Sequence, residues 1–106
     1  MKIVWTKHLE KKLKEYQLSK SKILKVIKKP YRLEEGVAPQ TIALMKPSCL
    51  PKTKKKKNWK QEIWVMIQKS KDVLKIISAW RYPGKSPEHN PVPQKIIQEL
   101  KKENII

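Results

Sequence analysis

Two neighbouring runs of apolar residues dominate the hydrophobic pattern of this chain. The first covers residues 62–68 and the second covers residues 73–82, and both are rich in β-branched and aromatic side chains. A short polar stretch, residues 69–72, separates them. Paired runs of this kind predict a buried β-hairpin at the centre of a small sheet.

Helical periodicity dominates the N-terminal third. Leu9, Leu13 and Tyr16 recur at the spacing of one helix face, which predicts an amphipathic helix that begins after a capping Thr6. A second helix is expected within residues 19–30, from a capping serine to a proline that disfavours helix in the residue before it. Together these two helices are expected to form a hairpin.

The remaining pattern completes an α+β chain. Residues 2–5 are expected to form a first strand or lead-in, and residues 31–35 and 41–45 two further strands. A last helix is expected with Pro93 in its first turn, followed by residues 103–106, which are expected to fray. We therefore expect an antiparallel meander of about four strands, with an N-terminal helical hairpin and a C-terminal helix, and with the helices on one face.

Two stretches lack periodicity. Residues 46–58 contain a lysine run and are expected to form a mobile loop, while residues 83–93 contain four prolines and predict a stiff, extended crossing. The length of 106 residues fits one domain that covers the whole chain, residues 1–106.

The charge narrows the class of partner. Lysine and arginine number 26 against 9 acidic residues, a net charge of +17, and 24 of the basic residues are lysine. Drift towards A/T-rich codons explains part of a lysine bias, but it does not explain so few acidic residues. A field this positive attracts polyanions, so we expect nucleic acid first, then an acidic protein, then anionic lipid.

Several classes of function lack any supporting motif. Cys49 is the only cysteine, which excludes a disulfide within one chain, and the two histidines have no metal-ligand spacing. No glycine-rich phosphate loop, signal peptide or apolar run of ~18 residues is present. We expect no cofactor and no metal, and a cytoplasmic protein.

Arg81 and Tyr82 are the first candidates for chemistry. They end the second apolar run, and a guanidinium has a planar fork that matches phosphate. The tyrosine can stack on a base or relay a proton. The alternative is structural, namely an ion pair of Arg81 with Glu34 or Glu62 and a tyrosine that packs.

His8 and Arg32 are the next candidates. Histidine transfers protons near neutral pH, and His8 lies at the border of the first apolar helix face. Its alternative is local packing. Arg32 is a candidate phosphate contact, and its alternative is a structural ion pair with the acidic residues that follow it.

The lysine-rich loop is a candidate nucleic-acid contact. Its side chains can follow a phosphate backbone, and Trp59 offers a stacking face beyond them. The lysines concerned are Lys52, Lys54, Lys55, Lys56 and Lys57. The alternative is a solvated basic segment without a partner.

Three short motifs resemble those of small toxins related to BrnT. They are Trp-Thr-Lys-His at residues 5–8, the alternating basic and acidic strand at residues 31–35, and Lys-Ile-Ile-Ser-Ala-Trp-Arg at residues 75–81. The resemblance covers about residues 3–82. In the family the arginine directly follows Ser-Ala, whereas here Trp80 intervenes.

The resemblance implies a fold like that of the RelE group, whose members cut RNA without a metal and are encoded beside an acidic antitoxin. By position it implies roles for His8, Arg32 and Arg81. We therefore expect a ribonuclease toxin of a type II toxin–antitoxin pair, acting on RNA or on ribosome-bound mRNA. Two alternatives stay open: a non-catalytic RNA- or DNA-binding domain, and a protein-interaction module for an acidic partner.

Overall fold

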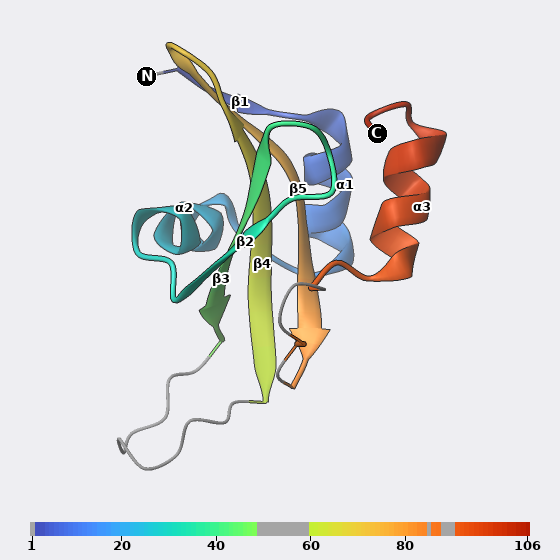
Figure 1. Ribbon diagram of the computed structural model, residues 1–106. Helices are drawn as coiled ribbons and strands as arrows, with labels where there is room; N and C mark the ends of the chain where they lie inside the picture. Colours follow the sequence, from blue (N-terminus) through green and yellow to red (C-terminus); the bar gives the residue numbers. More distant parts are fainter. Residues whose placement is uncertain (1, 49–59, 85, 88–90) are drawn as a thin grey trace.

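The computed structural model describes residues 2–48, 60–84, 86–87 and 91–106 (Figure 1). The elements are β1 (Lys2–Trp5), α1 (Lys7–Glu15), α2 (Lys20–Lys28), β2 (Arg32–Glu35), β3 (Thr41–Pro47), β4 (Gln61–Lys69), β5 (Val73–Pro83) and α3 (Gln94–Lys102). The fold is α+β, as expected. Within the described residues, no helix is both long enough and apolar enough to cross a membrane.

The sheet has five strands in the order β1-β5-β4-β3-β2. The expected central hairpin is confirmed, because β4 and β5 pair antiparallel around a short turn and are buried along most of their length. The expectation of about four antiparallel strands is met only in part: β2, β3, β4 and β5 pair antiparallel in chain order, but the sheet as a whole is mixed. β1 is a fifth strand, and it pairs parallel to β5, with Lys2 opposite Val73 and Trp5 opposite Ile76. This pairing joins segments about 70 residues apart, so the local pattern does not reveal it.

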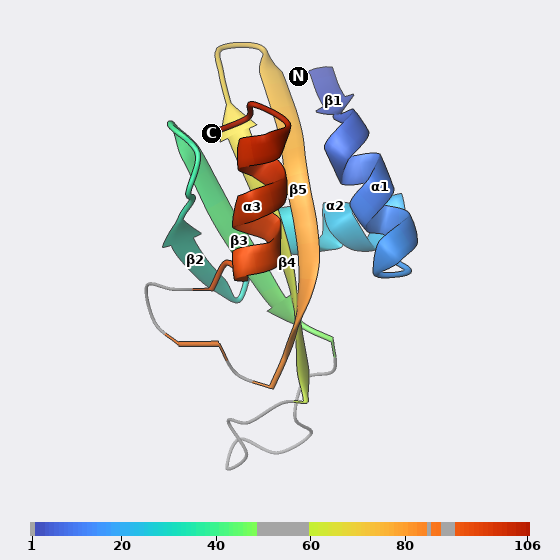
Figure 2. The same ribbon diagram turned by 90° about the vertical axis from the view of Figure 1, so that its right-hand side faces the viewer.

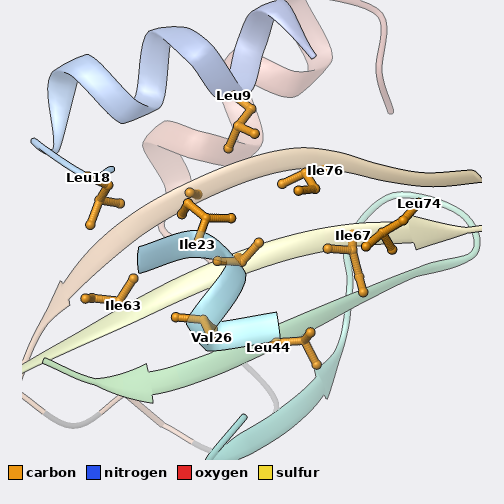
Figure 3. Close-up of a cluster of buried hydrophobic side chains, with 11 residues drawn as sticks. Leu9, Leu18, Ile23, Val26, Leu44, Ile63, Ile67, Leu74 and Ile76 are labelled. Atoms are coloured by element: carbon orange, nitrogen blue, oxygen red, sulfur yellow. The ribbon is translucent and has the colours of Figure 1, made fainter. Parts of the chain in front are cut away.

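Both faces of the sheet are covered, which corrects the expectation of helices on one face. Residues alternate between the two faces along each strand, and on β4 Ile63 and Val65 belong to one core cluster whereas Trp64 and Met66 belong to the other. Apolar side chains of α1 and α2 complete the first cluster (Figure 3), and those of α3 complete the second. Figure 2 shows α3 in front of the sheet and α2 behind it.

The predicted helix caps are confirmed. Thr6 Oγ1 accepts from the backbone N–H of Leu9 at 3.2 Å, and Ser19 Oγ accepts from that of Lys22 at 3.1 Å. These side chains satisfy N–H groups that have no partner within the helix. The helical hairpin is not confirmed, because Figure 1 shows α2 nearly along its axis while α1 runs along the sheet. Pro93 is the N-cap of α3 rather than part of its first turn.

Two helices end in the same left-handed turn. At the end of α1, Gln17 has φ 53° and the N–H of Leu18 donates to the Leu13 carbonyl at 2.8 Å. At the end of α3, Asn104 has φ 59° and Ile105 donates to the Leu100 carbonyl at 2.8 Å. This turn satisfies carbonyls of the last helical turn. The expectation that residues 103–106 fray is therefore wrong, because Ile105 and Ile106 pack against the α3 core cluster.

Candidate nucleic-acid interface

Arg81 is held by the connection between α1 and α2. Its Nε donates to the carbonyl oxygen of Tyr16 at 2.7 Å. Its two terminal nitrogens donate to the side-chain oxygen of Gln61 at 2.8 Å and to the carbonyl oxygen of Gln17 at 3.2 Å. Because Tyr16 and Gln17 form the turn that ends α1, the guanidinium links this turn to the sheet. All three nitrogens of the fork thus have protein acceptors.

Arg32 takes part in a network around the fully buried carboxylate of Glu62. One oxygen of Glu62 accepts from Trp64 Nε1 at 2.8 Å and from Ser86 Oγ at 2.5 Å. A terminal nitrogen of Arg32 lies 3.8 Å from the other oxygen, and its guanidinium lies over the Trp64 ring at 5.2 Å from the centroid. Arg32 also pairs with Glu34 at 3.3 Å. The ion-pair alternative for Arg32 is confirmed, whereas its contact with phosphate stays a prediction.

His8 bridges α1 to β5 and to the end of α3. Its ring is buried, its Nε2 lies 2.8 Å from Ser78 Oγ, and its Nδ1 is hydrogen-bonded to a carboxylate oxygen of Glu103. A carboxylate only accepts, so Nδ1 carries the proton that is shared with Glu103. In the neutral ring, Nε2 then accepts from the Ser78 hydroxyl. Both ring nitrogens have protein partners.

The structure does not bring the predicted catalytic residues into one contact. The carbonyl that binds Arg81 belongs to Tyr16, eight residues after His8 along α1, which corresponds to about 12 Å of helix. Arg81 points to the face that carries α1 and α2, while the partly buried Tyr82 packs against the α3 core cluster. Among the described residues, no group of three or more His, Cys, Asp or Glu side chains is placed to hold a metal ion.

Acidic residues gather where α1 meets α3, in what we call the charge ladder. Lys11 pairs with Glu103 at 3.3 Å, and Lys95 pairs with Glu15 at 3.2 Å. Between them, the buried Lys12 pairs with Glu15 at 3.2 Å and with Glu99. The charge ladder consists of Lys11, Lys12, Glu15, Lys95, Glu99 and Glu103. It joins two helices that belong to different core clusters.

The pKa values of Lys12, Glu15 and Glu103 reflect this pairing. Burial alone would lower the pKa of Lys12, but its hydrogen bonds to Glu99 and Glu15 outweigh burial and raise it. Burial would raise the pKa of Glu15 and Glu103, yet hydrogen bonds from Lys12 and Lys95 to Glu15, and from His8 and Lys11 to Glu103, lower both. Each of these three shifts favours the charged form of the side chain.

The surface of α2 has the opposite character. No acidic residue occurs between Glu15 and Glu34 in the sequence, and all the lysines of this segment are exposed. They are Lys20, Lys22, Lys25, Lys28 and Lys29. Lys20 lies over the ring of Trp5, 4.9 Å from its centroid, and the described residues provide no ion pair for these five ammonium groups. The buried side of α2 carries Ile23 and Val26 instead.

Two hollows border α2 and extend this positive surface. One, of about 200 Å³, is lined by Lys22 and Lys25 of α2 and by Lys46 of β3. The other, of about 660 Å³, lies against α1 and the first residue of α2, and Glu10 is its one acidic lining residue among those described. We call the lysines that line the two hollows the lysine belt. They are Lys7, Lys11, Lys14, Lys20, Lys22, Lys25 and Lys46.

Comparison with known proteins adds no information about the site. No protein-family model matches the chain, and neither a curated protein nor a solved structure matches it. The resemblance to BrnT-related toxins therefore stays a prediction.

The predicted lysine loop lies outside the described residues. This applies to Lys52, Lys54, Lys55, Lys56 and Lys57, and to Trp59 as the predicted stacking platform. Their contact with nucleic acid stays a prediction. Lys46, at the start of the predicted loop, is instead part of β3 and lines the smaller hollow.

Two features of the interface were not singled out from the sequence. The acid-free segment around α2 is visible as a gap in the distribution of Asp and Glu, so a count of acidic residues along the chain would have found it. The charge ladder has no comparable signal. It depends on the C-terminal helix lying beside α1, an arrangement that joins residues about 90 positions apart.

Proposed function

We propose that this chain is an RNA-binding domain that holds the phosphate backbone along the lysine belt. The observation that carries the proposal is the exposed, acid-free surface of α2, continued by Lys46 on one side and by the α1 lysines on the other. Ammonium groups that make no ion pair with a described carboxylate, such as those of Lys22 and Lys25, are available to replace the counterions of a phosphate backbone. Engagement by lysine rather than by a rigid fork of donors favours binding with little sequence preference.

Salt dependence tests this proposal directly. Lys11 of the belt already pairs with Glu103. If the other six lysines of the belt each neutralise one phosphate of a single strand, log affinity falls against log salt with a slope of about −4. The double variant Lys22→Gln/Lys25→Gln should flatten that slope by about 1.4 and weaken binding about tenfold at low salt. Fluorescence anisotropy of a labelled oligoribonucleotide over a salt series measures both quantities.

A matched control separates the belt from net charge. Lys101→Gln/Lys102→Gln removes the same charge from the exposed last turn of α3, which lines neither hollow of the belt. It should change the slope by less than half as much. Equal effects of the two double variants would contradict the belt and leave only a diffuse attraction of a basic protein for RNA.

RNA cleavage by a toxin-like, metal-independent ribonuclease is the second candidate. It is supported by the hydrogen-bonded series Ser78–His8–Glu103, which has the connections of a proton relay. To act on RNA, His8 has to exchange one of these partners for the substrate. Loss of cleavage in EDTA by His8→Gln, with RNA binding retained, would support this candidate. Binding without cleavage by the wild type would leave the binding domain.

An acidic protein partner, such as an antitoxin, is compatible with either candidate. Its acidic groups would neutralise the same lysine belt. Competition between the partner and RNA, lost in Lys22→Gln/Lys25→Gln, would place both on one surface.

A further inference from the structure

A cavity of about 530 Å³ lies beside His8, on the face of the sheet that carries α3. We call it the His8 cavity. Its wall comes from the start of α1, the end of the β4–β5 hairpin, the β2–β3 connection and the residues that follow α3. In Figure 2 the C-terminal end of α3 lies over the sheet just below the β4–β5 turn. The volume falls within the range of about 300–1,000 Å³ that small-molecule and cofactor pockets occupy.

The lining of the His8 cavity divides into a cationic part and an apolar part. Lys7 and Lys75 supply two exposed ammonium groups that make no ion pair with a described carboxylate. Ala38, Pro39 and Ile77 supply an apolar surface. An anion with a flat ring, whose face can pack against an apolar surface, fits both parts at once.

Glu103 does not cancel the positive charge at the cavity. It lines the cavity, but its two oxygens already accept from His8 and from Lys11. The net character of the lining is therefore cationic, with a carboxylate that is already paired. Gln68, which lies opposite Lys75 in the pairing of β4 with β5, adds a neutral amide to the lining, and its side-chain nitrogen donates to the carbonyl oxygen of Pro39 at 3.3 Å.

The cavity wall is held in place before any ligand arrives. The hydroxyl of Thr6 lies within hydrogen-bond distance of the carbonyl oxygens of Ile76 (3.1 Å) and Ile77 (3.0 Å), and it also caps α1. His8 is fixed from both ring nitrogens by Ser78 and Glu103. A ligand therefore does not have to order these side chains, which reduces the entropy lost on binding.

We propose that the His8 cavity binds one nucleotide, with its phosphate at Lys7 and Lys75 and its base against Ala38, Pro39 and Ile77. The choice of a nucleotide among ring-bearing anions rests on the proposed RNA-binding function. The nucleotide comes either from solution or from the bound RNA strand, because both offer the same phosphate and base.

Chemical-shift mapping of the ¹⁵N-labelled protein tests this inference with three probes: uridine monophosphate, adenosine monophosphate and inorganic phosphate. Both nucleotides should shift the amides of Lys7, Gln68, Lys75 and Ile77 and leave those of α2 in place. Lys75→Gln should weaken nucleotide binding about tenfold, the loss expected for one charge-assisted contact. The control Lys71→Gln removes the same charge from the exposed β4–β5 turn and should leave nucleotide affinity unchanged.

Three results would overturn the inference: no shift at these four amides, equal losses in Lys75→Gln and Lys71→Gln, or phosphate binding as tightly as either nucleotide. An oligoribonucleotide added to the same protein distinguishes the two sources. Lys7 belongs to the belt as well, so the amides of Gln68, Lys75 and Ile77 decide. If the oligoribonucleotide shifts these three, the nucleotide belongs to the bound strand, and if it leaves them in place, the ligand is free nucleotide.

Nucleotide binding at the His8 cavity and RNA binding at the lysine belt can be tested independently of each other. Loss of oligoribonucleotide binding in Lys22→Gln/Lys25→Gln, with mononucleotide binding retained, supports both. An oligoribonucleotide that does not bind the wild type at low salt overturns the lysine belt, and mononucleotide binding at the cavity is then judged from its own data.

Discussion

Lysine occupies two different environments in this molecule, the surface of α2 and the charge ladder. Lys12 is 4% exposed and contacts two carboxylates, whereas Lys22 and Lys25 are exposed and line a hollow without an acidic residue among its described lining. The difference lies in where the few Asp and Glu residues fall. In a chain with this much lysine, the positions of the carboxylates decide which lysines hold the fold and which remain for a partner.

The largest expected effect on stability comes from removing the charge of a buried lysine, compared with the same change at an exposed one. Lys12→Met leaves Glu15 and Glu99 without their shared partner at a buried position, so we expect it to reduce the free energy of unfolding by about 2 kcal/mol. The matched change Lys22→Met should alter it by less than about 0.5 kcal/mol. Urea denaturation followed by tryptophan fluorescence measures both. Equal losses would mean that the two environments do not differ.

A smaller effect is expected where the sheet meets the turn between α1 and α2. Arg81→Lys keeps the charge but loses the planar fork that reaches the turn carbonyls and Gln61, so we expect about 1 kcal/mol less stability. If Arg81 serves only the fold, the salt slope of RNA binding should not change. A flatter slope in the folded Arg81→Lys protein would instead make this arginine part of the interface.

The smallest effect is expected from pH. The pKa of Glu15 and Glu103 lies below the ordinary value of 4.5, so their contribution to stability is present above pH 4.5 and is lost as the pH falls through the lowered pKa. Lys12 has a raised pKa, so its contribution is present below 10.5 and is lost as the pH rises through the raised value.

Glu103→Gln should therefore lower the thermal midpoint at neutral pH and reduce its fall in acid. Thermal unfolding followed by circular dichroism from about pH 3 to pH 7 measures this dependence. Glu10→Gln is the matched control, because it also removes one carboxylate but lies outside the charge ladder. An acid dependence that is the same in Glu103→Gln and in the wild type would contradict the role of Glu103.

Local signals in the sequence predicted the elements well. The caps at Thr6 and Ser19 and the central hairpin each depend on a few adjacent residues, and each is confirmed. The layering could also have been predicted. Nearly continuous apolar runs, rather than alternating ones, belong to strands that are buried on both faces. The pairing of β1 with β5 could not have been predicted, because the sequence of a four-residue edge strand does not indicate which strand it pairs with.

The candidate site was harder to predict, because it depends on register. Arginine is rare in this chain, and that rarity drew attention to Arg32 and Arg81, whose contacts in the structure are with the protein itself. Their partners were not predictable. Glu62 shares the α3 face with Trp64 and meets Arg32, while Arg81, on the opposite face, meets backbone carbonyls. Each assignment depends on which face a residue takes, and one shift in strand register reverses it.

The parallel pairing of β1 with β5 also sets the order in which the molecule can be assembled. Thr6 contacts carbonyls of Ile76 and Ile77, and Lys2 pairs with Val73, so the N-terminal edge has no template until the β4–β5 hairpin exists. Closing a loop of this length comes at an entropic cost before any contact rewards it, which slows folding. During synthesis on the ribosome, the first strand therefore waits until most of the chain has emerged.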